Sequence, residues 1–462
     1  MSDLQDGLPK PRRYFAILAL CFGTALVVID ASIVSVALPT IAADLRVQPA
    51  SAVAIVTIYQ LVLVMTLLPF SALGSRIGLR RLYQYGLVTF CVASALCFFA
   101  RSLPFLLVTR AAQSLGAAAA LSVSSALIRS IYPSARLGRG LALNSIVVSS
   151  SAAFAPTLGG LLLAFASWPW IFAATVPFAL LSIWIGRRTL PEPQRRDEPY
   201  DTLAAVLCAL TFGLVIGGFE SVVHGDSPIV SIAVIAAGAT IGFVFVRREL
   251  RAKEPVLPVD LLARPELALS VGGATLAFIA SMTVLLSMPF RLEAQFGFSP
   301  SEVGALISPW PLGMMLFGPL AGILSDRIPA GVLGGIGMAV ATAALLLLAW
   351  LPADAQYLAI AWRMAMAGAG FGLFLAPNAR LIVGSAPRHR AASAGGLTST
   401  TRLTGQALGA TLVAALLAMN LGSGRTPALL AAGLACAAGI CSIARVRPLV
   451  AARAEDDDVG SL

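Results

Sequence analysis

Two ionisable side chains of opposite charge lie inside apolar runs of this 462-residue chain. Asp30 stands in "LVVIDASIVSVALP" (26–39), and Arg110 stands in "LLVTRAAQSLGAAAA" (106–120). A charge at the centre of a membrane helix costs about 2.5–3.5 kcal/mol on insertion scales, so such residues pair with each other or face an internal cavity. Burial and a nearby guanidinium act in opposite directions on a carboxyl group, and together they can leave it able to bind and release a proton. We therefore expect Asp30 to be a protonatable site, with a purely structural pairing to Arg110 as the alternative.

The composition indicates that these charges lie in a lipid bilayer. Hydrophobic residues make up 58% of the chain and charged residues 12%, against about 25% charged in soluble domains. The mean hydropathy is +0.87. No fold in water could cover so much apolar surface, so the sequence predicts an all-α polytopic membrane protein.

A membrane-spanning helix needs about 20 mainly apolar residues, and the sequence predicts fourteen of them. Their expected positions are roughly 14–38, 50–70, 80–100, 104–128, 140–163, 168–186, 202–219, 228–246, 267–290, 302–324, 331–351, 356–377, 393–420 and 427–445.

The net charge of +10 marks orientation rather than a nucleic-acid partner. If the N-terminus is cytoplasmic, the predicted inner loops and tails hold most of the 32 Lys and Arg. The outer loops hold Arg46, Arg101, Arg291 and Arg425. This asymmetry is the positive-inside pattern. It predicts a multi-pass protein of the plasma or inner membrane with both termini in the cytoplasm.

Two charged, proline-containing stretches, 187–201 and 247–266, divide the spans into blocks. We expect a cytoplasmic N-terminus (1–13), an N-terminal six-helix bundle (14–187), linkers with two extra helices (188–266), a C-terminal six-helix bundle (267–446) and an acidic cytoplasmic tail (447–462). The two bundles resemble each other weakly. In each, an arginine in the fourth span (Arg110 or Arg363) is followed by small residues. The distance in sequence between these two arginines is close to the distance between "SALGSRIG" (71–78) and "GILSDRIP" (322–329). Such a near-constant offset indicates a repeat.

The rise of 1.5 Å per residue places the charges in depth. Asp30 is expected about 12 Å and Arg110 about 9 Å from the outer surface, in the same bundle. Arg363 is expected about 10 Å deep in the second bundle, where the equivalent first helix offers no acid, so it would bind carbonyl groups or substrate anions. Arg402 lies in the inner half of the thirteenth span, where a snorkelling or structural arginine is the alternative to a functional one.

At these residues the chain resembles the major facilitator superfamily, and within it the fourteen-helix drug:proton antiporter branch. "IDASIVSVALP" is similar to that branch's first-helix motif, with Asp30 on its acid. "RAAQSLGAA" is similar to the fourth-helix motif, with Arg110, Gln113 and Gly116 on its Arg, Gln and Gly. The resemblance implies two six-helix bundles with two inserted helices, and a role for Arg110 in proton coupling.

Three further segments resemble gating motifs of that family. "APTLGG" is similar to the fifth-helix antiporter motif through Pro156, Gly159 and Gly160, although Ala155 stands where a glycine is usual. The inner-loop motif has two copies. The first keeps Arg76, Gly78, Arg80 and Arg81 but has Ser75 at the aspartate, and the second keeps Gly322, Asp326 and Arg327. An ordinary kinked helix and simple topology marking are the alternatives for the fifth-helix segment and for the basic cluster.

These features predict a proton-driven exporter of amphipathic organic compounds that works by alternating access. Its partners would be the lipid bilayer, protons and a small organic substrate, without a cofactor, metal or nucleic acid, and it is expected to be a monomer. Uptake of a metabolite by the same fold is the main alternative. A membrane enzyme or lipid scaffold fits less well because both histidines are in predicted loops and no hydrolytic or phosphate-binding motif is evident. A channel would need a ring of filter groups, and the sequence shows no repeated acids or other pattern that would form one.

Overall fold

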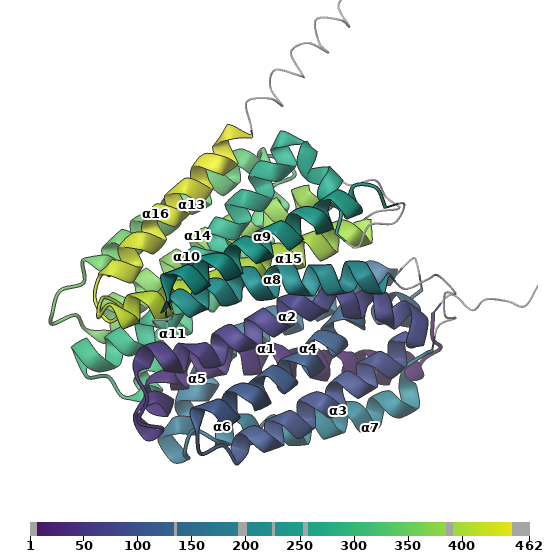
Figure 1. Ribbon diagram of the computed structural model, residues 1–462, viewed down its shortest axis with the longest axis horizontal. Coiled ribbons are helices and arrows are strands. Elements are labelled where there is room, and N and C mark those ends of the chain that lie inside the picture. The colour runs from purple at the N-terminus through teal and green to yellow at the C-terminus, as the bar shows by residue number, and fades with distance from the viewer. Residues whose placement is uncertain are drawn as a thin grey trace, which may run out of the picture. The chain divides into compact units, whose positions relative to one another are not determined.

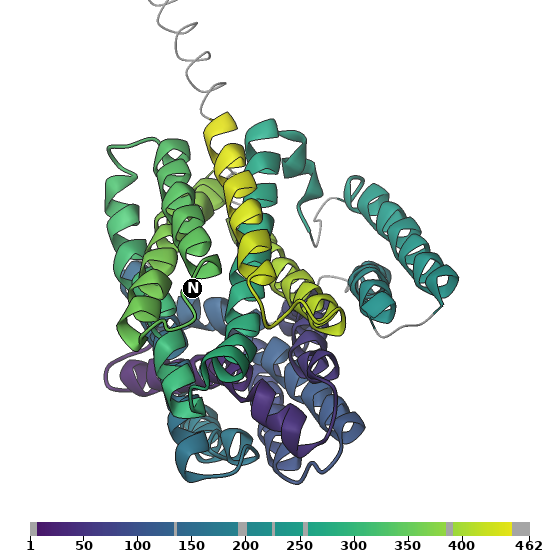
Figure 2. The ribbon, with the colours of Figure 1, turned by 90° about the vertical axis from the view of Figure 1, so that its left-hand side faces the viewer.

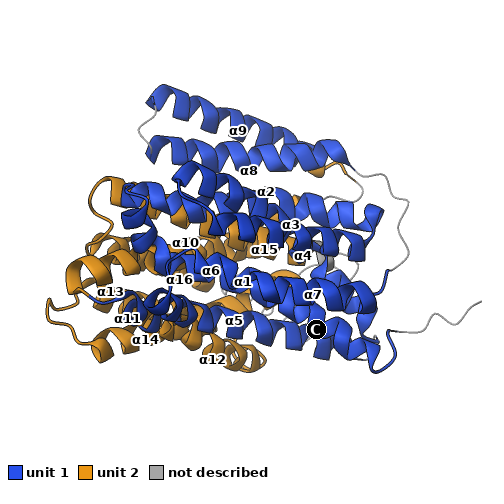
Figure 3. Cartoon of the chain, turned by 90° about the horizontal axis from the view of Figure 1, so that it is seen from below, with its two compact units in different colours: residues 1–248, 298–305 blue, residues 249–297, 306–462 orange. Residues whose placement is uncertain are grey.

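The computed structural model describes residues 7–133, 136–192, 201–223, 227–252, 257–384 and 391–445, and helices account for nearly all of these ranges (Figure 1). The predicted acidic tail, 447–462, lies outside the described residues. The chain divides into two compact units (Figure 3). Unit 1 comprises residues 1–248 and 298–305, and unit 2 comprises residues 249–297 and 306–462.

Unit 1 holds the first nine helices. They are α1 (Arg12–Asp44), α2 (Pro49–Ile77), α3 (Leu79–Phe98), α4 (Leu103–Ile131), α5 (Leu137–Phe165), α6 (Trp170–Ala173), α7 (Val176–Thr189), α8 (Thr202–Val223) and α9 (Pro228–Glu249). Proline begins α2, α4 and α7 at the first or second helical position, where its missing N–H leaves no hydrogen bond unmade.

Unit 2 holds the remaining elements. They are η2 (Val259–Ala263), α10 (Pro265–Phe296), α12 (Pro309–Leu324), α13 (Ala330–Ala349), α14 (Tyr357–Gly384), α15 (Ala391–Ala418) and α16 (Thr426–Ala444). The short helix α11 (Pro300–Ile307) crosses the division, since residues 298–305 group with unit 1.

Twelve stretches of the described chain are long and apolar enough to cross a membrane, with α6–α7 and α11–α12 each counted as one. Large side chains on their outer faces are exposed, among them Phe165 at 84% and Ile229 at 78%. A helix that is apolar on every side suits a lipid environment. The two long helices outside the twelve are α3, which begins with Arg80 and Arg81, and α15, which carries Arg402. The prediction of fourteen spans therefore stays a prediction for these two.

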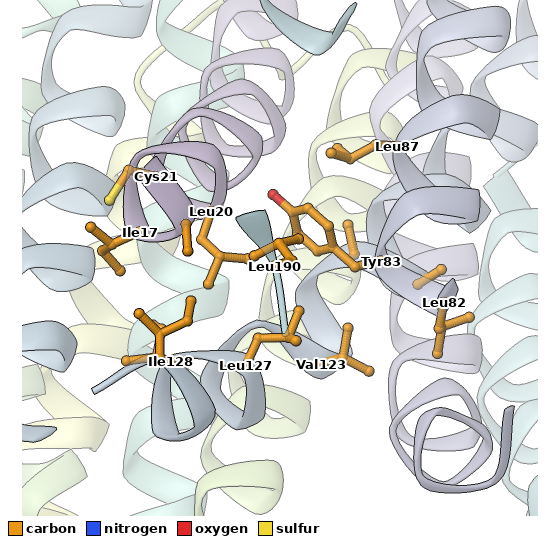
Figure 4. Close-up of a cluster of buried hydrophobic side chains, with 14 residues drawn as sticks. Ile17, Leu20, Cys21, Leu82, Tyr83, Leu87, Val123, Leu127, Ile128 and Leu190 are labelled. Atoms are coloured by element: carbon orange, nitrogen blue, oxygen red, sulfur yellow. The ribbon is translucent and has the colours of Figure 1, made fainter. Parts of the chain in front are cut away.

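An apolar cluster between α1, α3 and α4 holds unit 1 together near the start of α1. Figure 4 shows these side chains pointing toward one another: Ile17, Leu20, Cys21, Leu82, Tyr83, Leu87, Val123, Leu127, Ile128 and Leu190. The hydroxyl groups of Tyr83 and Ser182 both donate to the backbone oxygen of Ala19, at 3.1 and 2.8 Å. These bonds tie α3 and α7 to α1 where the helices are buried.

The two predicted extra helices belong to unit 1, where α8 and α9 lie side by side (Figures 1 and 2). Gly213 on α8 lies against Met65 on α2, and Gly238 on α9 lies against Leu214 on α8. Arg248 in the last turn of α9 pairs at 2.9 Å with Asp201, which lies just before α8 and outside the spans. The N–H of Ala204 and this guanidinium together hold the pKa of Asp201 below its ordinary value.

The helices of unit 2 approach each other closely through glycines. A methyl group at Gly368 on α14 would lie against the backbone oxygen of Trp310 on α12. The Trp310 indole packs against Phe371 with ring centres 5.0 Å apart. Small residues at such crossings let membrane helices pack without a hydrophobic driving force.

The crossing of α3 and α4 gives a testable prediction. A methyl group at Gly116 would lie 2.5 Å from the backbone N of Phe90 and 2.6 Å from the oxygen of Gly86. Backbone cannot move aside cheaply, so Gly116→Ala is expected to lower the free energy of unfolding by about 1–3 kcal/mol. Thermal unfolding of the purified protein in detergent measures this as a lower midpoint.

Gly138→Ala is the matched control, because among the described residues no neighbouring side chain or other helix lies within 4 Å of the added methyl group. It should leave the midpoint unchanged or raise it slightly, since alanine favours a helix over glycine. Equal midpoints for the two variants would contradict the packing assigned to α3 and α4.

Candidate functional site

The two charges singled out in the sequence are in direct contact in unit 1. Nη1 of Arg110 on α4 lies 2.7 Å from Oδ2 of Asp30 on α1. The exposed fraction is 0% for Asp30 and 1% for Arg110, so the ion pair is removed from solvent. A buried pair of this kind is neutral as a whole, and either charge alone would be strongly destabilising there.

Gln113 closes the pair into a small network. It stands one turn after Arg110 on α4, so both side chains leave the same face of the helix. Its Oε1 accepts from Nη1 of Arg110 at 2.6 Å, and its Nε2 donates to Oδ1 of Asp30 at 2.9 Å. The same Nε2 donates to the hydroxyl of Ser94 on α3 at 2.7 Å. Three helices therefore fix the position of the Asp30 carboxylate.

Two aromatic rings lie beside the Arg110 guanidinium. Its Cζ is 4.3 Å from the ring centre of Tyr59 on α2 and 5.4 Å from that of Phe172 on α6. Both rings are fully buried. A cation within about 6 Å of a ring face is attracted by the ring quadrupole, most strongly when water is excluded. The sequence analysis did not identify either ring, because an aromatic residue within an apolar span looks like ordinary core.

Phe172 is in turn held by Trp168, which precedes α6. The two rings meet edge to face with centres 6.3 Å apart. Nε1 of Trp168 donates to the Asp44 carboxylate at the end of α1, at 2.6 Å. A chain of contacts thus runs from Asp44 through Trp168 and Phe172 to the guanidinium that pairs with Asp30.

Several polar atoms near the pair have no hydrogen-bond partner among the described residues. They include Nε of Arg110 and the hydroxyl of Tyr59. An unsatisfied buried polar group costs about 1–3 kcal/mol. Such groups call for an explanation, and a site that changes its hydrogen bonding during a cycle provides one.

The predicted gating residues of α5 lie where that helix crosses two neighbours of unit 1. A methyl group at Gly159 would lie 2.7 Å from Cγ1 of Ile33, three residues after Asp30 on α1. A methyl group at Gly160 would lie 2.7 Å from the oxygen of Pro300, and one at Gly304 would lie 2.4 Å from the oxygen of Pro156. The glycines thus allow backbone-to-backbone contact on both sides of a helix that a proline interrupts.

The first inner-loop segment forms the corner between α2 and α3. Gly78 has φ 109°, a conformation that favours glycine. Arg80 donates to the backbone oxygen of Arg187 at the end of α7, while Arg76 and Arg81 are exposed. Ser75, which replaces the motif's aspartate, donates only within its own helix, to the oxygen of Ala72 at 2.7 Å.

The second copy of the inner-loop motif keeps its aspartate, Asp326, and this side chain forms an ion pair. Asp326 accepts from Arg380 on α14 at 2.6 Å, and Arg380 also donates to Ser325 at 2.9 Å. The oxygen of Gly322 accepts from the Ser325 hydroxyl, and Arg327 is exposed. Both partners of the ion pair are 61% exposed, and exposed pairs contribute at most about 1 kcal/mol.

The two arginines singled out in unit 2 are not in an ion pair among the described residues. Arg363 donates to the oxygen of Ala359 at 2.5 Å and lies 4.6 Å from the ring centre of Trp362. Ala359 belongs to the same helix, and Arg363 is only partly buried, so binding of a substrate anion by Arg363 stays a prediction. Arg402 lies partly buried within α15.

Two other arginines are buried near helix ends. Arg291, expected in an outer loop, is instead 3% exposed within α10 and donates to the oxygen of Leu348 at 2.8 Å. Arg445, at the end of the last predicted span, is 1% exposed and donates to Ser270 at 2.8 Å and to Asn378. Each stands at a helix end, where a basic residue is equally typical of a solvated loop.

Comparison with known proteins identifies the family. The family model of the Major Facilitator Superfamily matches residues 20–410, and a second match covers residues 271–458. The uncharacterized transporter YebQ of Escherichia coli (strain K12) is 42% identical over 438 residues, covering 94% of this chain and 96% of YebQ.

Other relatives have more specific names. The riboflavin transporter RibZ of Clostridioides difficile (strain 630) is 26% identical, covering 89% of each chain. The methyl viologen resistance protein SmvA of Salmonella typhimurium (strain LT2) is 29% identical, covering 85% of this chain and 80% of SmvA.

The fold is also found in solved structures. A bacterial homologue of the human lysosomal transporter Spinster, in its inward-facing and unoccupied conformation, superposes with a TM-score of 0.68 at 17% identity. The match covers 95% of this chain and 98% of that one. A family-model match across most of the chain, together with a transporter relative 42% identical over nearly the whole length, shows that this chain is a transporter of the major facilitator superfamily.

Proposed function

We propose that this transporter is a proton-coupled exporter of amphipathic organic compounds. The observation that carries the proposal is the fully buried network of Asp30, Arg110 and Gln113. A buried carboxylate neutralised by a single arginine is a place where adding one proton changes the charge balance of the site. Such intramembrane acids are typical of proton-coupled carriers.

The proposed cycle alternates between two charge states of the site. A proton entering from outside neutralises Asp30 and weakens its bond to Arg110 or to a cationic substrate. The loosened helices α1 and α4 then allow the carrier to reopen toward the cytoplasm, where Asp30 releases the proton and binds substrate again. The closed pair at 2.7 Å is the arrangement that the proposed cycle assigns to deprotonated Asp30.

The composition of the spans and the names of two relatives support the proposed substrate class. The sequence offers few amide side chains within its spans, which suits amphipathic compounds better than sugars. SmvA is named for resistance to methyl viologen, an organic dication. RibZ is named as a riboflavin transporter, which keeps proton-coupled uptake of a metabolite as the alternative function.

The proposal also includes the membrane arrangement. Helices α3 and α15 complete fourteen spans, as in the drug:proton antiporter branch, with two six-helix bundles at 14–187 and 267–446. The basic inner loops place both termini in the cytoplasm and the protein in the plasma or inner membrane. The crossing of α5 at Gly159 and Gly160 and the Asp326–Arg380 pair act as gates, and Arg363 and Arg402 contribute cations to the second bundle.

Inverted membrane vesicles test the coupling directly. An acid interior is imposed, and methyl viologen or ethidium is added outside. Wild-type protein should dissipate the pH gradient, because an antiporter moves protons out as it moves the compound in. Asp30→Asn should remove this response at equal protein level. Asp201→Asn, which changes an acid outside the spans, should respond as wild type does.

Placing the compound outside or inside the vesicles distinguishes export from uptake. A symporter would dissipate the gradient only when the compound is loaded inside the vesicles, so that result would replace export with uptake. A fully active Asp30→Asn variant would reject the coupling mechanism for either direction.

The energetic part of the proposal is tested by a double-mutant comparison. Asp30→Leu leaves Arg110 buried without its partner and should lower the free energy of unfolding by about 3–5 kcal/mol. Adding Arg110→Met should recover most of that loss, because an apolar pair needs no compensation. The midpoint of thermal unfolding measures both.

The exposed pair is the control for this comparison. Asp326→Ala and Arg380→Ala should each change stability by no more than about 1 kcal/mol, with little coupling between them. Similar coupling in the buried and the exposed pair would show that burial of Asp30 and Arg110 is not energetically significant.

A further inference from the structure

The Arg110 guanidinium has partners of two kinds, and only one of them disappears when Asp30 takes up a proton. Asp30 supplies a negative charge at 2.7 Å. Tyr59 and Phe172 supply ring faces at 4.3 and 5.4 Å, and Gln113 supplies a neutral oxygen at 2.6 Å. The ring faces and the amide oxygen remain whatever the protonation state of Asp30. We call Tyr59 and Phe172 the Arg110 aromatic cage.

The cage matters most in the protonated state. With Asp30 charged, the rings face an ion pair whose net charge is zero, and their quadrupoles interact weakly with it. With Asp30 protonated, Arg110 is a single buried cation, and the negative ring faces are its main remaining compensation. The cage therefore stabilises the protonated state more than the deprotonated one.

The surroundings of Asp30 contain few other groups that could have this effect. Helix α4 contributes Arg110 itself, and α3 contributes Cys97, whose thiol donates to the Thr109 hydroxyl at 3.3 Å. From α2 the nearby titratable group is Tyr59, and α6 contributes the uncharged ring of Phe172. The arginines of α5 and α7 stand in the first turn of α5 and the last turn of α7, at Arg139, Arg187 and Arg188.

The Tyr59 hydroxyl does not explain the position of this ring. It is buried and has no hydrogen-bond partner among the described residues, whereas the ring face lies directly on the guanidinium. Tyr83, another buried tyrosine of unit 1, uses its hydroxyl to bind the oxygen of Ala19. The contact that Tyr59 makes with the site is therefore through its ring and not through its hydroxyl group.

We propose that Tyr59 and Phe172 are positioning residues that hold Arg110 in place when Asp30 is protonated, and that they thereby set the pH at which Asp30 exchanges its proton. This inference rests on the proposed function, since it assumes that Asp30 titrates during transport. The ring faces, rather than any hydrogen bond, are the active element.

Infrared titration of the purified protein in lipid nanodiscs tests this without a substrate. The carboxyl band of protonated Asp30 is assigned by its loss in Asp30→Asn, and its midpoint is measured against pH. Removing a ring face destabilises the protonated state, so Tyr59→Leu and Phe172→Leu should each move the midpoint toward lower pH. The expected shift is about one pH unit, a tenfold loss of proton affinity.

Two control variants isolate the ring face. Tyr59→Phe keeps the ring and removes only the hydroxyl, so its midpoint should stay at the wild-type value. Tyr83→Leu removes a buried tyrosine that does not contact the guanidinium, and it should also leave the midpoint unchanged. A general loosening of the fold would instead move Tyr83→Leu and Tyr59→Leu together.

Three results would overturn the inference. They are an unchanged midpoint in both leucine variants of the cage, a full shift in Tyr59→Phe, and the absence of any Asp30 carboxyl band that titrates. The vesicle assay tests the proposed function separately. If the vesicles gave no proton response but the infrared shifts were as expected, proton-coupled export would be rejected and the role of the Arg110 aromatic cage would stand.

Discussion

A carboxylate and a guanidinium that are both removed from water must remain paired or lose a charge, and unit 1 is organised around that constraint. Asp30 and Arg110 meet at 2.7 Å with almost no exposed surface. Gln113 fills the hydrogen-bonding positions that remain between them, and Ser94 holds Gln113. In a medium of low dielectric constant, either charge alone would be strongly destabilising, and the opposite charge of its partner offsets that cost. Any process that changes the charge of one must therefore change the packing around both.

The packing of the helices explains how two charges come so close together. At Gly116 the backbone of α4 contacts that of α3, and Ser114 on α4 donates to the backbone oxygen of Tyr59 on α2 at 2.6 Å. On the other side of α1, Ile33 lies against Gly159 of α5. The charged network thus lies inside a tight contact of several helices. Ile33 is only three residues from Asp30, so the packing at the α1–α5 crossing connects the proposed proton site to a predicted gate.

The sequence predicted the bilayer, the helices and the Asp30–Arg110 contact, because hydropathy, helix rise and charge pairing act locally along the chain. The role of Gln113 came only from the resemblance, since one amide in a span has no distinctive spacing. Tyr59 and Phe172 could not be predicted, because their function depends on which helix face meets Arg110. Arg291 was misplaced for a related reason, as the backbone oxygen of Leu348 that it binds is distant in the sequence. Sequence patterns do not identify the long-range partners of single polar residues.

The central claim is that the Asp30 carboxyl group exchanges a proton as substrate binds. Counting protons in weakly buffered detergent solution measures this most directly, with methyl viologen added to the purified protein and the pH of the solution recorded. The account predicts that wild-type protein releases protons on binding and that Asp30→Asn binds the compound without releasing any. Proton release by Asp30→Asn equal to that of wild type would contradict it.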